Sequence, residues 1–346
     1  TDAPVYDAVW GYIVPLAIPL LLFQLDLRAV FKESRRLLFL FLISSAGTMI
    51  GVVLGFLMLR ERIPELDKIA GMISASYTGG GVNFAAMTAQ LEPTKDITAA
   101  TIVSDNLMMA CYFLILIGLA AAPAVRRMWG SPFQDKADAE SQGSDTNPAA
   151  AFWRAKPISM QSIALSLGAS ILLVAVAFSV SAFLKGVLGS GSNIATEMLI
   201  SLVTDKYLLL TTLTFAVIAL MPRSMAKLDG SQELGTYCIF LFFVVIGVPA
   251  SIPLILQNAP LLFVFTLTVA VVNLAVTLAA GKLFKYSIEE VVLACNANIG
   301  GPTTAAALAI GRGWRALVGP ILVIGTAGYI FGNYIGSMIY AVLSSM

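Results

Sequence analysis

The chain has 346 residues, of which 58% are hydrophobic and only 12% are charged. An ordinary soluble domain carries about 25% charged residues, so this composition is typical of a polytopic integral membrane protein, and the net charge of +1 gives no reason to expect a nucleic acid partner. The absence of histidine excludes histidine-ligated haem, HExxH zinc chemistry and Ser-His triads, while three isolated cysteines indicate neither a disulfide framework nor a metal cluster.

Apolar runs of about 20 residues, each a candidate membrane helix, follow one another along the chain. Two of them, 70–90 and 290–310, are interrupted by glycines. The run at 199–221 contains Asp205 and Lys206, which leaves the short apolar segment Tyr207–Met221. The runs are 8–27, 37–59, 70–90, 97–122, 163–184, 199–221, 234–256, 259–284, 290–310 and 318–343.

A polar segment at 131–150 has few large apolar residues, and its composition predicts a flexible, solvent-exposed linker. We therefore divide the chain into a first repeat at 1–125, a cytoplasmic linker at 126–160 and a second repeat at 161–346. The second repeat has two runs without a counterpart before Thr1, so we expect the natural chain to extend N-terminally by one or two helices.

The two interrupted runs share a pattern: residues 78–83 read Thr-Gly-Gly-Gly-Val-Asn, and residues 298–303 read Asn-Ile-Gly-Gly-Pro-Thr. A shift of about 220 residues superimposes Gly80 on Gly300 and Gly81 on Gly301, and it also aligns the neighbouring runs. Each glycine disfavours helix by roughly 1 kcal/mol, and Pro302 removes a backbone donor. Helices broken at matching places in two halves indicate a transporter binding site.

The distribution of the 21 Lys and Arg residues bears on how the interrupted runs lie. If each run dips into the membrane and returns, most of these cations share one face, whereas two full crossings spread them more evenly. The positive-inside rule favours the first arrangement, which makes the repeats antiparallel. The predicted fold is an all-α polytopic membrane protein of two inverted repeats, with a broken or re-entrant helix in each.

Unwound chain survives in hydrocarbon only where protein or a polar cavity surrounds it. Half-helix N-termini offer N–H groups to an anion, and half-helix C-termini offer carbonyls to a cation. Tight helix packing is the alternative interpretation, since glycine and serine also mark close contacts. The expected solute-binding residues are Ser76, Gly79, Gly80, Gly81, Asn83, Asn296, Gly300, Gly301, Thr303 and Thr304.

Asp105 lies inside the run 97–122, where an ionisable side chain is costly and therefore a candidate functional group. The Asp105 carboxylate could balance the charge of a sodium ion or carry a proton in proton coupling. The alternative interpretation is that Asp105 lies near the membrane interface and has no role in transport. Hydroxyl, amide and carboxylate oxygens suit a hard cation. The predicted ligands of the ion are Thr78, Asn83, Asp105, Asn298 and Thr303.

The remaining polar and small residues are predicted to be structural. Asn273 is expected to form an inter-helix hydrogen bond, Asp205-Lys206 to form a neutralised pair at a helix start, and the Glu289-Glu290 pair to cap the second broken helix. Two stripes with glycine at every fourth position predict close helix packing. They are Gly47, Gly51 and Gly55, and Gly328, Gly332 and Gly336.

The segments 76–86 and 295–305, together with Trp10-Gly11-Tyr12 and residues 15–20, resemble a group of bacterial and plastid membrane proteins, domain of unknown function 819. The group is similar in design to the superfamily of bile-acid/sodium, glutamate/sodium and citrate/sodium symporters and cation/proton antiporters. The resemblance implies two inverted repeats, a mobile core domain that carries the broken helices, a scaffold domain and a homodimer.

The sequence therefore predicts a secondary active transporter in the bacterial cytoplasmic membrane. Its expected activity is sodium-coupled symport of a small organic anion (a carboxylate, amino acid or short peptide) by an elevator-type mechanism. Proton-coupled transport or cation/proton antiport is the first alternative, and a non-transport membrane scaffold is the second. No enzymatic activity and no resident cofactor are expected, because neither a GxSxG nucleophile nor a paired-aspartate motif is present.

Overall fold

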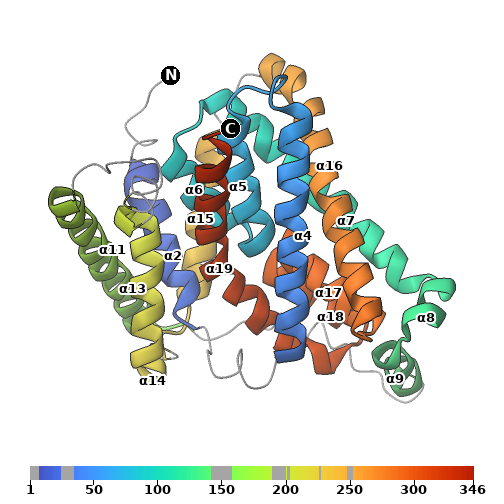
Figure 1. The fold of residues 1–346 in the computed structure, drawn as a ribbon. Helices are drawn as coiled ribbons and strands as arrows, with labels where there is room; N and C mark the ends of the chain where they lie inside the picture. Colours follow the sequence, from blue (N-terminus) through green and yellow to red (C-terminus); the bar gives the residue numbers. More distant parts are fainter. Residues whose placement is uncertain are drawn as a thin grey trace.

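The computed structural model describes residues 8–24, 35–141, 158–188, 200, 203–225, 227–247 and 252–346, and within these every regular element is a helix (Figure 1). Parts of the predicted linker (142–157) and of the runs 8–27, 199–221 and 234–256 lie outside the described residues. The elements are η1 (Val9–Ile13), α2 (Val14–Leu22), α4 (Arg35–Leu59), α5 (Leu66–Gly79), α6 (Gly81–Leu91), α7 (Lys95–Ala121), α8 (Pro123–Trp129), α9 (Pro132–Ser141), α11 (Met160–Leu188), α13 (Lys206–Leu220), α14 (Pro222–Met225), α15 (Ser231–Gly247), α16 (Ile252–Leu283), α17 (Ile288–Ile299), α18 (Gly301–Gly311) and α19 (Arg315–Leu343).

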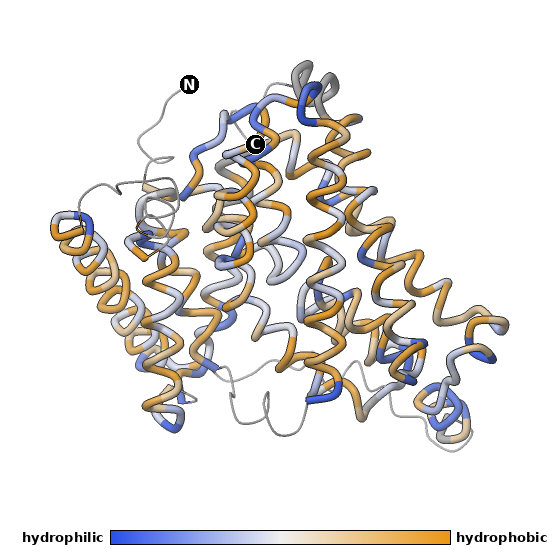
Figure 2. Tube along the Cα trace, in the orientation of Figure 1, coloured by the Kyte–Doolittle hydropathy of each residue, from blue (hydrophilic) through white to orange (hydrophobic). Residues whose placement is uncertain are grey.

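Five described helices are long and apolar enough to cross a membrane, and they lie within α4, α7, α11, α16 and α19. Apolar residues follow these helices along their lengths, whereas hydrophilic residues gather at their ends and on α9 (Figure 2). The run that contains Asp205 gives a shorter helix, α13, of 15 residues. Asp205 begins it as predicted, because its carboxylate accepts hydrogen bonds from the first free amides of the helix.

Both glycine-interrupted runs are broken helices, as predicted. We call the pair α5 and α6 hairpin 1, and the pair α17 and α18 hairpin 2. Gly80 separates the helices of hairpin 1 with a φ of 76°, and Gly301 begins α18 with a φ of 83°, values that glycine adopts readily. The boundaries recur at a shift of 220 residues: α6 and α18 begin at Gly81 and Gly301, and α7 and α19 begin at Lys95 and Arg315.

The two ends of hairpin 1 are joined to each other. The Thr94 amide, after α6, donates to Glu65 Oε2, before α5, at 2.8 Å. Lys68 Nζ donates to Glu65 Oε1 at 3.0 Å and to the carbonyl of Glu92 at 3.3 Å. Hairpin 1 therefore enters and leaves the bundle at the same place, which is the geometry of a re-entrant segment and not of a crossing helix.

Hairpin 2 is closed at its ends by a residue of α9. The backbone amide of Gln134 donates to Glu289 Oε1, in the first turn of α17, at 2.9 Å. The side-chain oxygen of Gln134 accepts a hydrogen bond from Trp314 Nε1, just beyond α18, at 2.9 Å. The beginning and the end of hairpin 2 thus lie on either side of one glutamine, and this hairpin is also re-entrant.

The two hairpins start from opposite ends of α4. Arg36, in the first turn of α4, pairs with Glu290 in the first turn of α17 at 2.9 Å. Glu290 also forms a capping box with Ser287, which confirms the predicted cap. Hairpin 1, in contrast, begins shortly after α4 ends at Leu59. Because α4 has 25 residues and is about 37 Å long, the hairpins approach each other from opposite sides.

The helices pack as two groups (Figure 1). The first group, formed by α4, α7, α16, α19 and both hairpins, has α16 against α4 and α19 against α5. The second group, formed by α2, α11, α13 and α15, packs mainly on itself. Smaller contacts join the groups, from α2 and α15 to α6 and from α13 to α19. In the last of these, Asn333 Nδ2 of α19 donates to Thr211 Oγ1 of α13 at 3.0 Å.

The glycine stripes allow the helices of the first group to pack backbone against backbone, as predicted. A Cβ on Gly336 would lie 2.7 Å from the Gly71 carbonyl, and one on Gly332 would lie 2.7 Å from the Ala75 carbonyl. A Cβ on Gly51 would lie 2.8 Å from the Cα of Val269. The first stripe seats α4 on α16, and the second seats α19 on hairpin 1.

The beginning of the linker is more ordered than its composition predicts. Residues 132–141 form α9, which packs over the ends of hairpin 2 through Gln134. The helix is anchored from the preceding segment, since Arg126 pairs with Asp135 at 2.8 Å and with Asp138 at 3.3 Å. A low apolar content predicted flexibility here, but tertiary contacts of the polar side chains fix the helix.

Candidate functional site

The tips of the two hairpins meet inside the bundle. A Cβ on Gly80 would lie 3.8 Å from the Cα of Gly301, and a Cβ on Gly301 would lie 3.9 Å from the Cα of Gly80. The descending helices α5 and α17 have 14 and 12 residues, about 21 and 18 Å. Their combined length is close to that of a bilayer with its interfaces, roughly 40 Å, so the tips meet near the centre of the membrane-spanning bundle.

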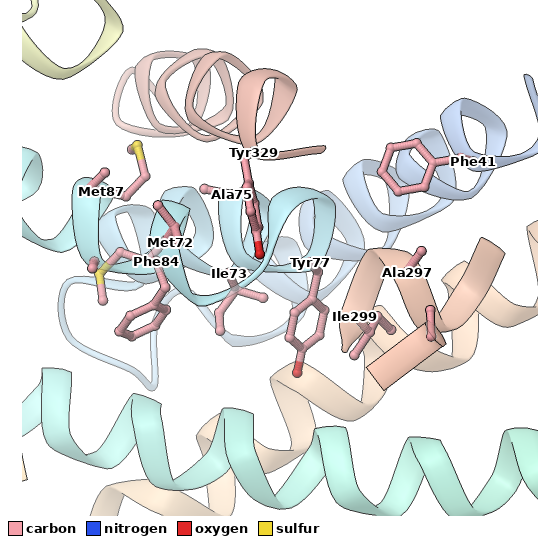
Figure 3. Close-up of a cluster of buried hydrophobic side chains, with 14 of the residues drawn as sticks. Phe41, Met72, Ile73, Ala75, Tyr77, Phe84, Met87, Ala297, Ile299 and Tyr329 are labelled. Carbon is pink, nitrogen blue, oxygen red and sulfur yellow. The ribbon is translucent and has the colours of Figure 1, made fainter. Parts of the chain in front are cut away.

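Apolar side chains enclose the meeting point (Figure 3). Phe41 of α4, Phe84 of α6 and Ile299 of α17 are each at most 3% exposed. The ring of Tyr329, from α19, lies over the tip of hairpin 1, where its Cε1 atom would be 3.6 Å from a Cβ on Gly80. The unwound backbone at the two breaks is therefore enclosed by protein.

The breaks leave two half-helix N-termini, those of α6 and α18, close together. Neither has a side-chain cap. The Asn83 amide already donates to the Gly80 carbonyl at 3.0 Å, and Pro302 has no N–H group, so the first turn of each helix has fewer free N–H groups than a regular helix N-terminus. Each N-terminus also carries the partial positive charge of its helix dipole. Such a pair of N-termini attracts an anionic group, because backbone donors and both dipoles act in the same sense.

Three buried polar atoms near the tips lack a hydrogen-bond partner: Asn83 Oδ1, Asn296 Nδ2 and the hydroxyl of Tyr77. The three residues are at most 3% exposed. An unsatisfied buried polar group costs about 1–3 kcal/mol, so a concentration of them is characteristic of a binding site or a site of movement. They come from α6, α17 and α5, so both hairpins contribute.

Asp105 of α7 is partly buried and faces hairpin 1. Ser76 Oγ donates to its Oδ2 atom at 3.3 Å. The Tyr77 ring extends away from α5 (Figure 3), and Asp105 and Thr266 of α16 are the polar side chains close to its hydroxyl, although neither forms a hydrogen bond with it. The geometry thus joins two predicted site residues, Ser76 and Asp105, and adds Tyr77, which the sequence motif contained but which we did not predict.

Hairpin 2 supplies a second polar pair. Thr304 Oγ1, in the first turn of α18, donates to Asn296 Oδ1 of α17 at 3.0 Å and to the Gly301 carbonyl at 3.1 Å. A Cβ on Gly300 would overlap this hydrogen bond. The predicted residues Asn296, Gly300, Gly301 and Thr304 therefore form one cluster at the tip of hairpin 2.

Asn83 holds the tip of hairpin 1 against α19. Its Nδ2 atom donates to the Gly328 carbonyl at 3.2 Å, and a Cβ on Gly79 would overlap its amide. Gly79 and Asn83 are thus required for packing as well as being candidate site residues. Gly81 begins α6 directly at the tip and is partly exposed.

The other predicted ion ligands are not gathered around Asp105 by described contacts. Thr78 Oγ1 donates to the Ser74 carbonyl of its own helix at 2.8 Å. The amide of Asn298 is occupied, since its Oδ1 accepts from Ser45 Oγ at 2.8 Å and its Nδ2 donates to two carbonyls, one of them on α4. Thr303 is exposed on α18. The described residues also include no group of three or more His, Cys, Asp or Glu that could hold a metal ion.

Asn273 forms the inter-helix hydrogen bonds predicted for it. Its Nδ2 atom donates to the Ser44 carbonyl at 2.8 Å and to Thr48 Oγ1 at 3.0 Å, and its Oδ1 accepts from the Tyr112 hydroxyl at 2.7 Å. Thr48 in turn donates to the Tyr77 carbonyl at 3.3 Å. This network joins α4, α7 and α16 and supports hairpin 1 from behind.

Fold and site together define the class: an α-helical integral membrane protein in which two re-entrant hairpins meet tip to tip within a helical bundle. The chain belongs to the family described as Protein of unknown function (DUF819), which it matches over residues 1–346. It is 53% identical over 336 residues to the uncharacterized membrane protein YjcL of Bacillus subtilis (strain 168), an alignment that covers 97% of this chain and 83% of the relative.

Proposed function

We propose that this protein is a secondary active transporter whose solute binds where the hairpin tips meet. The observation that carries the proposal is the contact of Gly80 with Gly301 at the end of two re-entrant hairpins that enter from opposite sides. Irregular backbone at membrane depth is stable only inside protein or around a polar cavity, and it is costly for a merely structural bundle. Transporters use such discontinuous helices to bind solutes and ions.

The chemistry of the tips favours a small organic anion: a carboxylate, an amino acid or a short peptide. Two uncapped helix N-termini offer backbone N–H groups, and Asn296 offers an unpartnered amide donor beside them. The unpartnered Asn83 Oδ1 adds an acceptor, which suits a solute that also carries a donor. Ser76, Thr303 and Thr304 extend the polar surface from both hairpins.

Sodium is the proposed coupling ion. Asp105, Ser76 and Tyr77 offer a carboxylate and two hydroxyl oxygens, which are hard donors that fit a hard cation. An ion moving with the solute gains about 2.3 kcal/mol per charge for each 100 mV of membrane potential. Proton coupling is the second candidate, and it is favoured by the same partly buried carboxylate, which could carry a proton in place of the ion.

The proposed mechanism is elevator-type alternating access in an inverted-repeat protein. Three observations support it: the opposed entry of the hairpins, the constant shift between their boundaries, and the packing of the helices in two groups. In this scheme the hairpin group is the mobile core domain, and α2, α11, α13 and α15 form the scaffold domain, which would also hold a homodimer together.

The distribution of cations supports placing the ends of hairpin 2 in the cytoplasm, in the cytoplasmic membrane of a bacterium. In Figure 1 the start of α4, helices α8, α9 and α14 and the end of α16 lie at one end of the bundle, and the end of α4, the starts of α5, α7 and α13 and the end of α11 lie at the other. The segments at the first end contain or adjoin Arg35, Arg36, Arg126, Arg127, Lys136, Arg223, Lys227, Lys282, Lys285 and Arg312, and those at the other end contain or adjoin Arg60, Arg62, Lys68, Lys95, Lys185 and Lys206.

The test is uptake into proteoliposomes of a panel of labelled carboxylates, amino acids and short peptides, driven by a sodium gradient and separately by a proton gradient. We expect sodium-driven uptake of an anionic member of the panel and its loss in Asp105→Asn. The control Asp229→Asn changes an exposed aspartate outside both hairpins and should transport normally. Uptake by neither gradient, or full activity of Asp105→Asn, would overturn the corresponding part of the proposal.

A further inference from the structure

A cavity of about 370 Å³ opens between α8 and α9, at a distance from the hairpin tips. Only Ala122 separates α8 from α7, one of the candidate membrane spans, so the cavity lies where the chain emerges from the membrane. It is lined by Pro123, Arg126, Arg127, Gly130, Ser131 and Asp135.

The two arginines of the cavity differ in their surroundings. Arg126 is held in place, because Nη2 pairs with Asp135 at 2.8 Å and with Asp138 at 3.3 Å while Nε donates to Ser131 Oγ at 3.1 Å. These two carboxylates more than neutralise Arg126 and order one wall of the cavity, so the attraction of this region for an anion comes from other cations. Arg127 is exposed, and no ion pair joins it to any residue that the structure describes.

A further cation adjoins the same helix. Lys282, at the end of α16, donates to the Met128 carbonyl and lies 5.3 Å from the centre of the Trp129 ring. The last turn of α8 thus has Arg127 on one side and Lys282 close to its carbonyl end. These cations favour a compact anion, and arginine binds phosphate, like carboxylate, with matched bidentate geometry.

Apolar side chains border these cations. Met128 is 56% exposed, Leu283 is 74% exposed and Phe284 is 47% exposed. Met128 follows Arg127 in α8, and Leu283 and Phe284 follow Lys282 at the end of α16, so exposed apolar side chains adjoin the cations in both segments. A free phosphate ion would contact only the cations. A phospholipid would contact the cations and the apolar side chains, with its phosphate near Arg127 and its acyl chains against the apolar side chains.

We propose that the cavity between α8 and α9 binds the phosphate of an anionic phospholipid headgroup. Arg127 is the principal contact of the phosphate. Arg126, held in place by Asp135 and Asp138, forms one wall of the site. The site is independent of the solute at the hairpin tips, and it places a lipid beside α9, the helix that closes the ends of hairpin 2.

The experiment measures binding of dioctanoyl phosphatidylglycerol to the purified full chain in detergent, by the shift in apparent melting temperature over a lipid titration. Dioctanoyl phosphatidylcholine and inorganic phosphate are titrated in parallel. We expect phosphatidylglycerol to raise the melting temperature by a few degrees and to do so well below the concentrations at which the other two act. Arg127→Gln should weaken its apparent affinity roughly fivefold, the effect expected for one membrane-proximal cation.

The control is Arg223→Gln, which removes another exposed arginine at the same end of the molecule. Both variants change an exposed side chain without an ion pair among the described residues, so both should fold as the parent does. Equal affinities of Arg127→Gln and Arg223→Gln would overturn the site. Equal effects of inorganic phosphate and phosphatidylglycerol would overturn the lipid as its ligand.

Discussion

Substitution of Gly332 by alanine tests how closely α19 is packed on hairpin 1. The added Cβ would lie 2.7 Å from the Ala75 carbonyl and 2.8 Å from the Asn83 Cγ atom. The first neighbour is backbone of α5, and the second belongs to a fully buried side chain whose amide donates to the Gly328 carbonyl. Neither can move without displacing the tip of hairpin 1.

Overpacking of this kind costs about 1–3 kcal/mol, and rigid neighbours place Gly332→Ala near the upper value. Since 1 kcal/mol corresponds to about 2 °C in a chain of this size, the apparent melting temperature should fall by about 6 °C. If hairpin 1 also positions the solute site, solute uptake by Gly332→Ala should fall further than the amount of folded protein does.

The matched control is Gly319→Ala in the same helix, where the added Cβ meets nothing within 4 Å. Alanine is favoured over glycine in a helix by about 1 kcal/mol, so this variant should melt at the parent temperature or slightly above. Thermal unfolding of the three proteins in one detergent decides the matter. If Gly332→Ala melts with the parent, the close contact between α19 and hairpin 1 is wrong.

Three further substitutions probe other contacts. Asn273→Ala leaves the buried Tyr112 hydroxyl without its acceptor, so the free energy of unfolding should fall by about 2 kcal/mol. Asn273→Asp keeps that acceptor but replaces the donor to the Ser44 carbonyl with a carboxylate oxygen, so it should not restore the stability. Glu65→Gln tests the closure of hairpin 1: burial raises the pKa of Glu65, but hydrogen bonds from the Thr94 amide and Lys68 outweigh it and hold the net pKa below the usual value. The ionised Glu65 therefore stabilises the folded protein above its unfolded pKa, and this contribution is lost as the pH falls through the folded pKa. The contribution is at most about 1 kcal/mol. Melting curves between pH 3 and 6 should show its loss in the parent protein and not in Glu65→Gln. Gln134→Ala removes the link to Trp314, and faster proteolysis within residues 132–141 should report the release of α9.

The breaks in the two hairpins could be predicted because glycine and proline act locally. Three consecutive glycines disfavour helix whatever surrounds them, and a second interruption at the same shift makes chance packing a poor explanation. The glycine stripes and the helix start at Asp205 were predicted for the same reason. Each of these features depends on backbone chemistry that the sequence states directly.

The partners of the polar side chains could not be predicted, because they depend on which helices become neighbours. Asn298 and Thr78 have the chemistry of ion ligands, but their polar atoms bond to α4 and to the Ser74 carbonyl. Tyr77 was overlooked because an aromatic side chain next to glycines is usually a packing residue. The order of α9 also escaped prediction, since it depends on Gln134 meeting two residues far away in the chain.

The most direct test of the account is the side from which the ends of each hairpin can be labelled. Single cysteines at Glu61 and Thr94 flank hairpin 1, and single cysteines at Lys285 and Gly311 flank hairpin 2, in a background that lacks Cys111, Cys238 and Cys295. A membrane-impermeant thiol reagent is applied to right-side-out and to inside-out vesicles. The account predicts that both ends of hairpin 1 react from one side of the membrane and both ends of hairpin 2 from the other. Reaction of the two ends of either hairpin from opposite sides would show a crossing helix and contradict it.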